Sequence, residues 1–346
     1  MKPSNIGGQA VIEGIMMRNK DKYAVAVRKP NKEIEVDVQD YKSVIPFSGV
    51  QKVPFLRGIF AFVDSMVLGM KILSFSASFY DEEDTENINE SDSKNSQNKE
   101  LGDTMDMKSS TKEKDISDDS YKTEDKHQKK KPGIKVTEST GKILQALTMV
   151  LGIIIAVGIF MILPYFISSI FRAQISSRML LVILEGIIRL GIFVGYILLI
   201  SRMNDIKRTF MYHGAEHKCI NCIENNLDLN VENVRESSKQ HKRCGTSFLF
   251  FVMIVSIIFS FFITADAQIL RVLIRLALLP LIAGVSYEII KLAGSTNNPI
   301  INILSKPGMM VQNITTLEPD DSMIEVAIEA VEAVFDWKEF QTNETA

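Results

Sequence analysis

Four long apolar runs constrain the fold of this 346-residue chain more than any other feature. They cover Ile143–Ile170, Met179–Ile200, Ser247–Ile263 and Ile269–Ile290. A helix needs about 20 apolar residues to cross a bilayer. Two short links, FRAQISSR and TADAQ, join the runs in pairs. The sequence therefore predicts a multi-pass α-helical membrane protein with two transmembrane hairpins, residues 143–201 and 247–292.

Basic residues flank these hairpins on one side only. They lie before the first run and between the second and the third, at Lys126, Lys129, Lys130, Lys131, Lys135, Lys142, Arg202, Lys207, Arg208, Lys218, Arg235, Lys239, Lys242 and Arg243. The two links at the hairpin tips carry few Lys and Arg residues. Cytoplasmic flanks of membrane spans carry an excess of Lys and Arg. We therefore expect a cell-membrane protein with both termini and the loop 202–246 in the cytoplasm.

A fifth apolar run, Phe55–Ala77, differs from the other four because it contains charges. Arg57, Asp64 and Lys71 follow one another at seven-residue spacing, which places them on one face of a helix. This pattern favours an amphipathic helix over residues 55–80 that lies in the membrane interface. A fifth span is the alternative.

The segment that follows is strongly polar. Residues 81–131 hold six large apolar side chains, namely Ile88, Leu101, Met105, Met107, Ile116 and Tyr121. Such a segment cannot bury enough surface to offset its ordering entropy. We therefore expect a disordered linker, acidic and rich in lysine, over residues 81–135.

The two ends of the chain show the patterns of small cytoplasmic elements. Tyr23–Val27 and Glu33–Val38 alternate around a turn at Pro30-Asn31, so residues 1–54 are predicted to form a strand-rich module with one apolar hairpin face. Within the C-terminal segment 293–346, helix-start residues at 319–322 precede an amphipathic run. We expect that helix to pack on the N-terminal module.

Composition excludes two classes of protein. The net charge is -3 and basic residues form no continuous stripe, so we expect no nucleic-acid partner. Only three cysteines and the polar start MKPSNIGGQA argue against a secreted disulfide scaffold. The predicted partners are the lipid bilayer and other membrane proteins, and the oligomeric state stays open.

The residues that carry chemistry gather in the loop after the second span. The chain has four histidines and three cysteines, and six of these seven residues lie between 213 and 244. His213, Glu216 and His217 form the pattern His-x-x-Glu-His, known from zinc proteases. Residues four apart share a helix face, so both histidines can bind one metal with Glu216 beside it as the general base. Glu224, seven residues after His217, could complete the ligand set. A polar helix end without a metal is the alternative.

The same loop also fits a structural zinc site. Cys219-x-x-Cys222 precedes His241-x-x-Cys244 by eighteen residues, which is the spacing of two zinc knuckles. In that arrangement the metal would hold the loop together. A redox Cys-x-x-Cys is a third interpretation, which the absence of a thioredoxin-like pattern around it disfavours.

Some ionisable residues lie within the apolar runs. Glu185 and Arg189 are four residues apart and are predicted to neutralise each other, while Glu288 lies near the cytoplasmic end of the fourth run. Ionisable groups inside a membrane are candidates for function. They are too few to indicate a transport path.

A set of short motifs is spread along the chain: Gly7–Arg18 (GGQAVIEGIMMR), Arg57-Gly58, Tyr212–Lys218 (YHGAEHK), Val231–Arg235 (VENVR), Arg243–Phe248 (RCGTSF), Tyr287-Glu288 and Thr315–Pro319 (TTLEP). Together these motifs resemble the YqhQ family of bacterial membrane proteins, which have been described as predicted metal-dependent enzymes. The resemblance covers most of the chain outside residues 81–131.

The resemblance narrows the candidate site. In the family pattern proline follows the histidine at 241, where this chain has Lys242, and cysteines at 219 and 222 are not required. The resemblance thus implies a shared site made of His213, Glu216, His217, Glu224, His241 and Cys244. It also implies that Glu13, in the N-terminal motif, faces this site as a second catalytic candidate.

Two functions remain as hypotheses. The first is a membrane hydrolase with a cytoplasmic site for zinc or another divalent metal, which acts on a peptide or a lipid-linked substrate. In it, His213 and His217 with Glu224, His241 or Cys244 are the ligands and Glu216 is the base. The second is a scaffold or regulator of another membrane complex, in which the metal is structural.

Overall fold

The computed structural model describes residues 3–44, 53–100, 138–264, 267–295 and 298–345. The chain divides into two compact units, residues 1–82 with 158–346, and residues 83–157. The first unit holds the sheet, the apolar part of α1, the helices after residue 158 and the His/Cys loop. The second holds the polar part of α1 and the helix α2 (Glu138–Val157).

A four-stranded antiparallel sheet forms the N-terminal module. Its strands are β1 (Gly7–Val11), β2 (Gly14–Asn19), β3 (Lys22–Arg28) and β4 (Ile34–Asp40), in that spatial order. The predicted alternating strands are β3 and β4, which pair with Val25 opposite Asp37. The GGQAVIEGIMMR motif forms the hairpin of β1 and β2.

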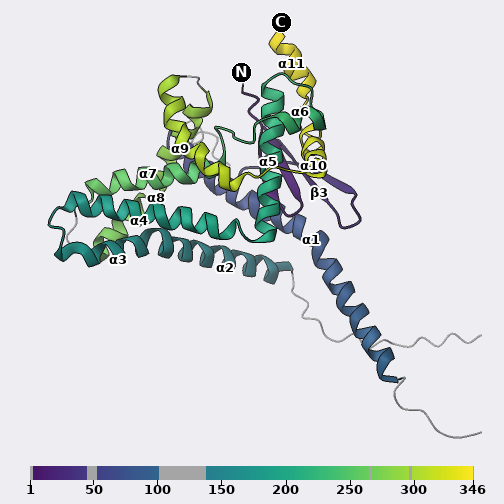
Figure 1. Ribbon diagram of the computed structural model, residues 1–346, viewed down its shortest axis with the longest axis horizontal. Helices are drawn as coiled ribbons and strands as arrows, with labels where there is room; N and C mark the ends of the chain where they lie inside the picture. The colour runs from purple at the N-terminus through teal and green to yellow at the C-terminus, as the bar shows by residue number, and fades with distance from the viewer. Residues whose placement is uncertain (1–2, 45–52, 101–137, 265–266, 296–297, 346) are drawn as a thin grey trace, which may run out of the picture. The chain divides into compact units, whose positions relative to one another are not determined.

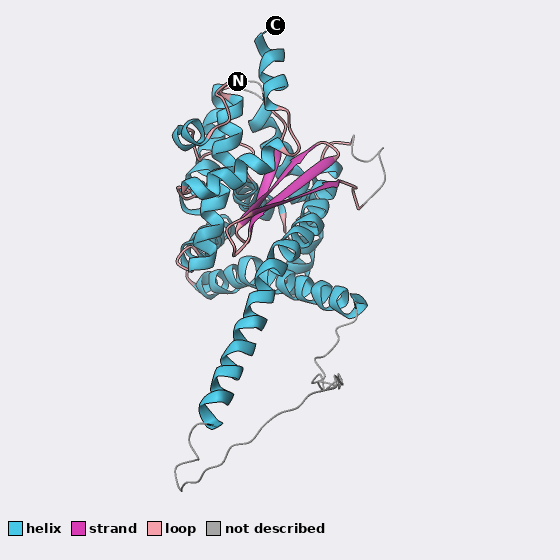
Figure 2. Ribbon diagram, turned by 90° about the vertical axis from the view of Figure 1, so that its right-hand side faces the viewer, coloured by secondary structure: helices cyan, strands magenta, loops and turns pink. Residues whose placement is uncertain are grey.

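Helices pack against both faces of this sheet (Figure 2). Ile15 and Met17 contact α5 (Asn204–Glu224) and α10 (Asp321–Glu332), while Met16 points the other way toward α1 (Leu56–Glu100). Successive side chains of a strand alternate between faces, and here both faces are apolar. The expectation of a single apolar hairpin face is therefore wrong for β3, whose residues Tyr23–Val27 are all buried.

The charged face of α1 is occupied by protein partners. Asp64 accepts hydrogen bonds from Tyr41 and Ser43 at the end of the sheet, and Lys71 donates to Tyr23 at 2.9 Å. At the start of the helix, Arg57 pairs with Glu288 of α8 (Gln268–Ser295). The three charges do lie along one side of the helix, as the spacing predicts.

The helix α1 is longer than the sequence predicts, because it continues through residues 81–100. A helix started by the apolar segment gains one hydrogen bond for each added residue, so it can extend into a polar segment, and the linker over residues 81–135 stays a prediction. The rest of the predicted linker lies outside the described residues.

Five helical segments of the described residues are long and apolar enough to cross a membrane. They are Leu56–Tyr80, Ala146–Ala173, Arg178–Ile200, Gly245–Phe262 and Ile269–Ser295. Four correspond to the predicted runs and the first to the helix predicted in the interface. Together they indicate a membrane protein.

The first of the four predicted runs is interrupted. After α2, a π-helical turn over Gly158–Ile162 and the helix α3 (Leu163–Ile170) follow, and a 3-10 turn covers Phe171–Ala173. Pro164 begins α3 and cannot donate a helical hydrogen bond, which explains the irregular turn before it.

The helices α4 (Arg178–Ile200), α7 (Gly245–Phe262) and α8 lie side by side (Figure 1). The sequence analysis missed the helix α9 (Pro299–Thr315), which packs through Val311 against Phe193, Ile197 and Met253. A proline within α9 and the mixed polarity of its sequence hid its amphipathic pattern.

The C-terminal part confirms the predicted helix. Asp320 caps α10 by accepting from the backbone N–H of Met323 at 3.0 Å, and Ile324 and Val331 are buried in the core with the sheet and α5. Two short helices complete this module, α6 (Val231–Glu236) and α11 (Trp337–Thr345).

Candidate metal centre

His213, His217 and Cys244 form a compact cluster of potential metal ligands. In the part of the chain that the structure describes, this is the one group of three or more such residues whose ligand atoms all lie within 4.8 Å of one another. The Cys244 Sγ is 3.3 Å from the His213 Nε2. Zinc bonds of about 2.0–2.3 Å in a tetrahedron place their ligands about 3.5 Å apart. The cluster therefore offers the donor groups that zinc prefers, and the distance from the Cys244 Sγ to the His213 Nε2 is close to that of a tetrahedral zinc site.

Backbone carbonyls orient both histidine rings toward the cluster. The Nδ1 of His213 lies 2.9 Å from the carbonyl oxygen of Thr315, and the Nδ1 of His217 lies 2.7 Å from that of Lys239. A carbonyl only accepts, so each Nδ1 carries the hydrogen and each Nε2 keeps its lone pair for a metal. Burial lowers the pKa of His217, which keeps this ring neutral.

The third ligand reaches the histidines because α5 holds the loop that precedes it. Lys218 donates to the carbonyls of Arg235 and Ser237, each at 2.8 Å, and Asn221 donates to those of Ser238 and Gln240. These donors share the loop-facing side of α5 with His217. They bring residues 237–244 against the helix and so place Cys244 beside His213.

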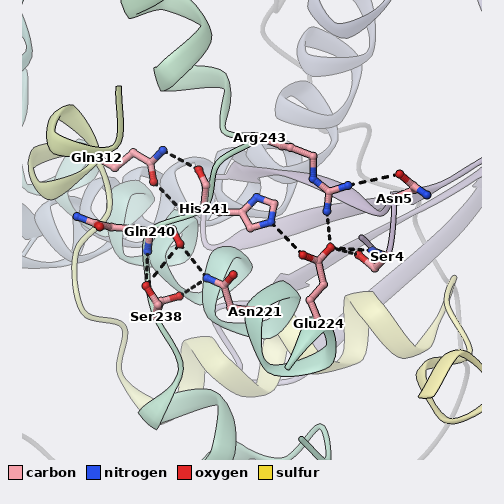
Figure 3. Close-up of polar contacts among 9 residues, drawn as sticks. All are labelled: Ser4, Asn5, Asn221, Glu224, Ser238, Gln240, His241, Arg243 and Gln312. Carbon is pink, nitrogen blue, oxygen red and sulfur yellow. Dashed lines mark hydrogen bonds and ion pairs between the residues drawn. The ribbon is translucent and has the colours of Figure 1, made fainter. Parts of the chain in front are cut away.

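A second element holds the same loop from the other side. Gln312 of α9 accepts from the His241 N–H at 2.9 Å and donates to the His241 carbonyl at 2.8 Å, and it also donates to Ser247. Figure 3 shows this paired contact. Cys244 is the N-cap of α7, where its Sγ accepts from the Thr246 N–H.

Glu216 lies next to the cluster on a cavity of about 570 Å³. The cavity is lined by the candidate ligands His213 and Cys244 and by the Glu216 side chain. Burial raises the pKa of this carboxyl, although His213 and the Gly8 N–H counteract the rise. A carboxylate with a raised pKa is a better proton acceptor near neutral pH.

The rest of the cavity wall is mainly apolar. It comes from β1, α1, α5, α7 and α8, with Ala10, Phe62, Phe210, Leu249 and Ile290 among its residues. The strand β1 approaches closely at Gly8, where an added Cβ would lie 2.8 Å from the Glu216 Cδ. Glycine at this position leaves space for the carboxylate.

Glu224, predicted as a ligand, lies apart from the cluster. It accepts from the Ser4 N–H at 2.7 Å and the Ser4 hydroxyl at 2.8 Å, and it pairs with Arg243 (Figure 3). Seven residues place Glu224 on the same helix face as His217 but about 10 Å further along the axis, which is too far for one metal ion.

His241, also predicted as a ligand, lies beside Glu224 and Arg243 rather than in the cluster. Its Nε2 is 3.6 Å from the Glu224 carboxylate, and its ring centroid is 5.8 Å from that of His217. Burial alone would raise the pKa of Glu224, but His241, Arg243 and the Ser4 N–H together lower it to about 2. Glu224 is thus an ionised carboxylate that pairs with Arg243 and His241 and accepts a hydrogen bond from the Ser4 N–H.

Cys219 and Cys222 do not form the predicted zinc knuckle. Cys219 is fully buried in the apolar core between α5 and the sheet. The Cys222 thiol faces the carbonyls of Leu227 and Asp228. Burial raises the pKa of both thiols, that of Cys222 to about 11, so both stay protonated.

Glu13 also lies away from the cavity. It sits in the β1–β2 turn with a positive φ of 48°, and its carboxylate binds Arg208 and accepts from the Tyr212 hydroxyl at 3.3 Å. Its role in the structure is to connect this turn to α5. The structure thus unites His213, Glu216, His217 and Cys244 and separates Glu13, Glu224 and His241 from them.

Sequence reasoning missed the residues that position the site. Asn221 carried a usable signal, since it lies four residues after His217 and three after Lys218 and so shares a helix face with both. Gln312 and Thr315 lie in the unpredicted helix α9, so nothing in the pattern connected them with the loop.

Comparisons with known proteins place the chain in a family. Residues 53–337 match the family described as protein of unknown function (DUF1385). The chain is also 33% identical over 329 residues to the uncharacterized protein YqhQ of Bacillus subtilis (strain 168), which covers 95% of this chain and 91% of that protein. No solved structure matches. The chain therefore belongs to the YqhQ family of proteins of unknown function.

Proposed function

We propose that this protein is a membrane enzyme that binds zinc or another divalent metal through His213, His217 and Cys244 and catalyses a hydrolysis. One observation carries the proposal: two of the three clustered candidate ligands, His213 and Cys244, line a large cavity that the buried Glu216 side chain also lines. Structural zinc sites have four protein ligands, whereas catalytic ones have three and an open position. A cavity beside His213 and Cys244 supports an open position of this kind.

The residues of the site have complementary tasks in such a reaction. A bound metal would supply an activated water, because it lowers the pKa of that water toward neutrality. Glu216 takes the proton of the water as the new C–O bond forms at a carbonyl carbon. It then returns this proton to the leaving group as the bond to that group breaks.

The cavity wall favours a substrate with an apolar portion. Phe62, Phe210 and Leu249 offer apolar surface, and Arg243 lies at the wall near the cluster. A lipid-linked acyl compound or an apolar peptide fits this lining, with the scissile bond at the His and Cys side chains.

The packing of the sheet on α5 and α10 supports a specific membrane topology. These elements share one apolar core, so the sheet and α5 lie on the same side of the membrane. The chain must then cross an even number of times between residues 40 and 204. The segments Ala146–Ala173 and Arg178–Ile200 supply two crossings. We infer that α1 lies at the cytoplasmic surface of the cell membrane and that four segments span it.

The contacts of α1 support the same assignment. Leu68 and Ile72 pack on the sheet, and Tyr80 binds the carbonyl of Arg28 at the end of β3. The side chains of Leu56, Phe62, Val67 and Leu73 remain exposed. A helix with one face on a cytoplasmic sheet and apolar side chains elsewhere suits the membrane interface.

Metal content tests the ligand assignment. We expect about one zinc for each chain of detergent-purified wild type by elemental mass spectrometry, and its loss from His213→Ala plus His217→Ala and from Cys244→Ala. Cys219→Ala plus Cys222→Ala is the matched control and should keep the metal. If only the Cys219→Ala plus Cys222→Ala variant lost its zinc, the metal would be structural and a scaffold role would be favoured.

Substitution of Glu216 tests catalysis separately from binding. Glu216→Gln should keep the metal and lose hydrolysis of fluorogenic long-chain acyl esters and N-acyl peptides by a factor of about 10² or more. The exposed Glu329→Gln is the control. Equal hydrolysis by Glu216→Gln and wild type would contradict the role of Glu216.

A further inference from the structure

A second polar cavity lies at the other ends of α4 and α7. It has a volume of about 40 Å³ and lies where α3 and the 3-10 turn meet the start of α4, the end of α7 and the first turns of α8. The guanidinium groups that line it belong to Arg172, Arg178, Arg271 and Arg275. The candidate metal centre and this cavity are separated by the length of α7, 18 residues or about 27 Å.

Among the described residues that line this cavity, arginines outnumber carboxylates. Glu185 is the one carboxylate among the described residues that line it. This carboxylate is shared between two arginines: Arg189 donates to it at 2.6 Å and Arg275 at 2.8 Å. Two further arginines use uncharged acceptors, because Arg172 donates to the Tyr165 hydroxyl and Arg178 to the Ile263 carbonyl.

A buried donor in this cluster lacks an acceptor. Arg275, which lines the cavity, is 6% exposed, and its Nε has no hydrogen-bond partner. The Arg275 guanidinium also lies 5.1 Å from the centre of the Tyr165 ring. A buried cationic donor without an acceptor is costly, more so in an apolar bundle. An anion in the cavity would remove this cost.

We propose that this cavity binds a phosphate group, as the headgroup of an anionic phospholipid or as free phosphate. Guanidinium groups form paired hydrogen bonds with phosphate oxygens and keep their charge at every physiological pH. The volume exceeds the about 10–15 Å³ that one water molecule needs, so a group of a few atoms can enter. This site goes beyond the proposed hydrolysis and does not depend on it.

The position suits a lipid headgroup. The separation of about 27 Å from the metal centre is close to the thickness of a bilayer core. In the topology proposed above, the arginine cavity therefore faces the headgroups of the outer leaflet. Phosphatidylglycerol is the appropriate probe for this source, and inorganic phosphate is the probe for the other.

Thermal unfolding of the full chain in a neutral detergent tests the proposal. We expect phosphatidylglycerol to raise the Tm of wild type in a saturable manner, while diacylglycerol, which lacks the phosphate, leaves it unchanged. Arg172→Gln plus Arg271→Gln should weaken the apparent affinity at least tenfold. Lys22→Gln plus Lys42→Gln removes the same charge from the sheet module and should bind as wild type.

The source of the phosphate follows from a parallel titration. A Tm rise with inorganic phosphate at constant ionic strength, but not with phosphatidylglycerol, would support the cavity and assign it to a free anion. If neither probe stabilises wild type above its neutral counterpart, the proposal is overturned, whether or not the arginine variant folds. Equal affinities of wild type and a folded arginine variant would also overturn it.

Discussion

At the scale of single residues, the partners of a buried carboxylate decide whether it is suited to proton transfer. Glu216 and Glu224 lie on the same helix and both are buried, yet the pKa of Glu216 is raised and that of Glu224 is lowered. The difference comes from their partners, since Glu224 faces Arg243 and His241 while Glu216 faces a mostly apolar cavity. One carboxylate is therefore suited to proton transfer and the other to holding structure.

Glu224 should make the stability of the protein depend on acid pH. Its pKa of about 2 in the folded state lies below the about 4.3 of an unfolded chain, so its contribution is complete above pH 4.3 and disappears as the pH falls toward 2. The Tm of Glu224→Gln should lie below that of wild type at pH 7, by an equivalent of at most about 3 kcal/mol.

This difference in Tm should shrink when unfolding is followed at successively lower pH. The exposed Glu329→Gln serves as the control, for which we expect a small difference at every pH. A constant gap between Glu224→Gln and wild type down to pH 3 would contradict the assigned ion pair.

Gly8 should tolerate no side chain. An added Cβ would lie 2.8 Å from both the Glu216 side chain and the Met16 carbonyl, whereas at Gly7 no atom lies within 4 Å. We expect Gly8→Ala to destabilise the protein by about 1–3 kcal/mol and Gly7→Ala to have little effect. Denaturant unfolding of the two variants in the same detergent measures this, and equal midpoints would show that β1 does not pack on Glu216.

At the scale of elements, α5 connects the sheet with the loop that carries Cys244. One side of it packs on the sheet, and the other carries the histidines and the donors that hold the loop 237–244. At Gly214 the helix touches the segment before α10, because an added Cβ would lie 2.0 Å from the Leu317 carbonyl oxygen. The same segment supplies the Thr315 carbonyl that orients His213.

Gly214→Ala should therefore affect folding and metal binding together. The clash is with backbone, so we expect a loss of about 3 kcal/mol or more and a displaced His213. Gly195→Ala in α4, with no atom within 4 Å of the added Cβ, is the matched control and should keep stability and metal. Tm and zinc content of both variants are the measurements. Retention of zinc with a wild-type Tm by Gly214→Ala would be inconsistent with this packing.

At the scale of the whole molecule, one apolar core joins elements that are distant in the sequence. Ile15 of β2, Ile220 of α5 and Ile324 of α10 belong to the same buried cluster. Because a bilayer cannot separate residues in contact, this core restricts where the chain can cross the membrane.

Cysteine labelling of intact cells should report the resulting topology. The native cysteines are buried, so exposed positions such as Lys42→Cys, Ser176→Cys and Thr342→Cys supply the signal. A membrane-impermeant maleimide should label only Ser176→Cys, at the tip of the first hairpin, whereas the other two should react after lysis. Labelling of Lys42→Cys or Thr342→Cys from outside would contradict the proposed orientation.

The sequence by itself determined the features that depend on local periodicity. The apolar runs, the alternating strands β3 and β4 and the amphipathic helix α10 all follow from side-chain spacing along one element. The facing pair His213 and His217 follows in the same way, since four residues make about one turn. These features need no knowledge of the path of the chain.

Only the tertiary structure decided which residues from distant parts of the sequence meet His213 and His217 at the site. Cys244 completes the cluster because donors on α5 and the Gln312 amide bend the loop 237–244 back onto the helix. Cys219, although closer in sequence, points into the core. The partners of Arg57, Asp64 and Lys71 were equally hidden, because hydrogen bonds between elements depend on packing over the whole chain rather than on spacing within one helix.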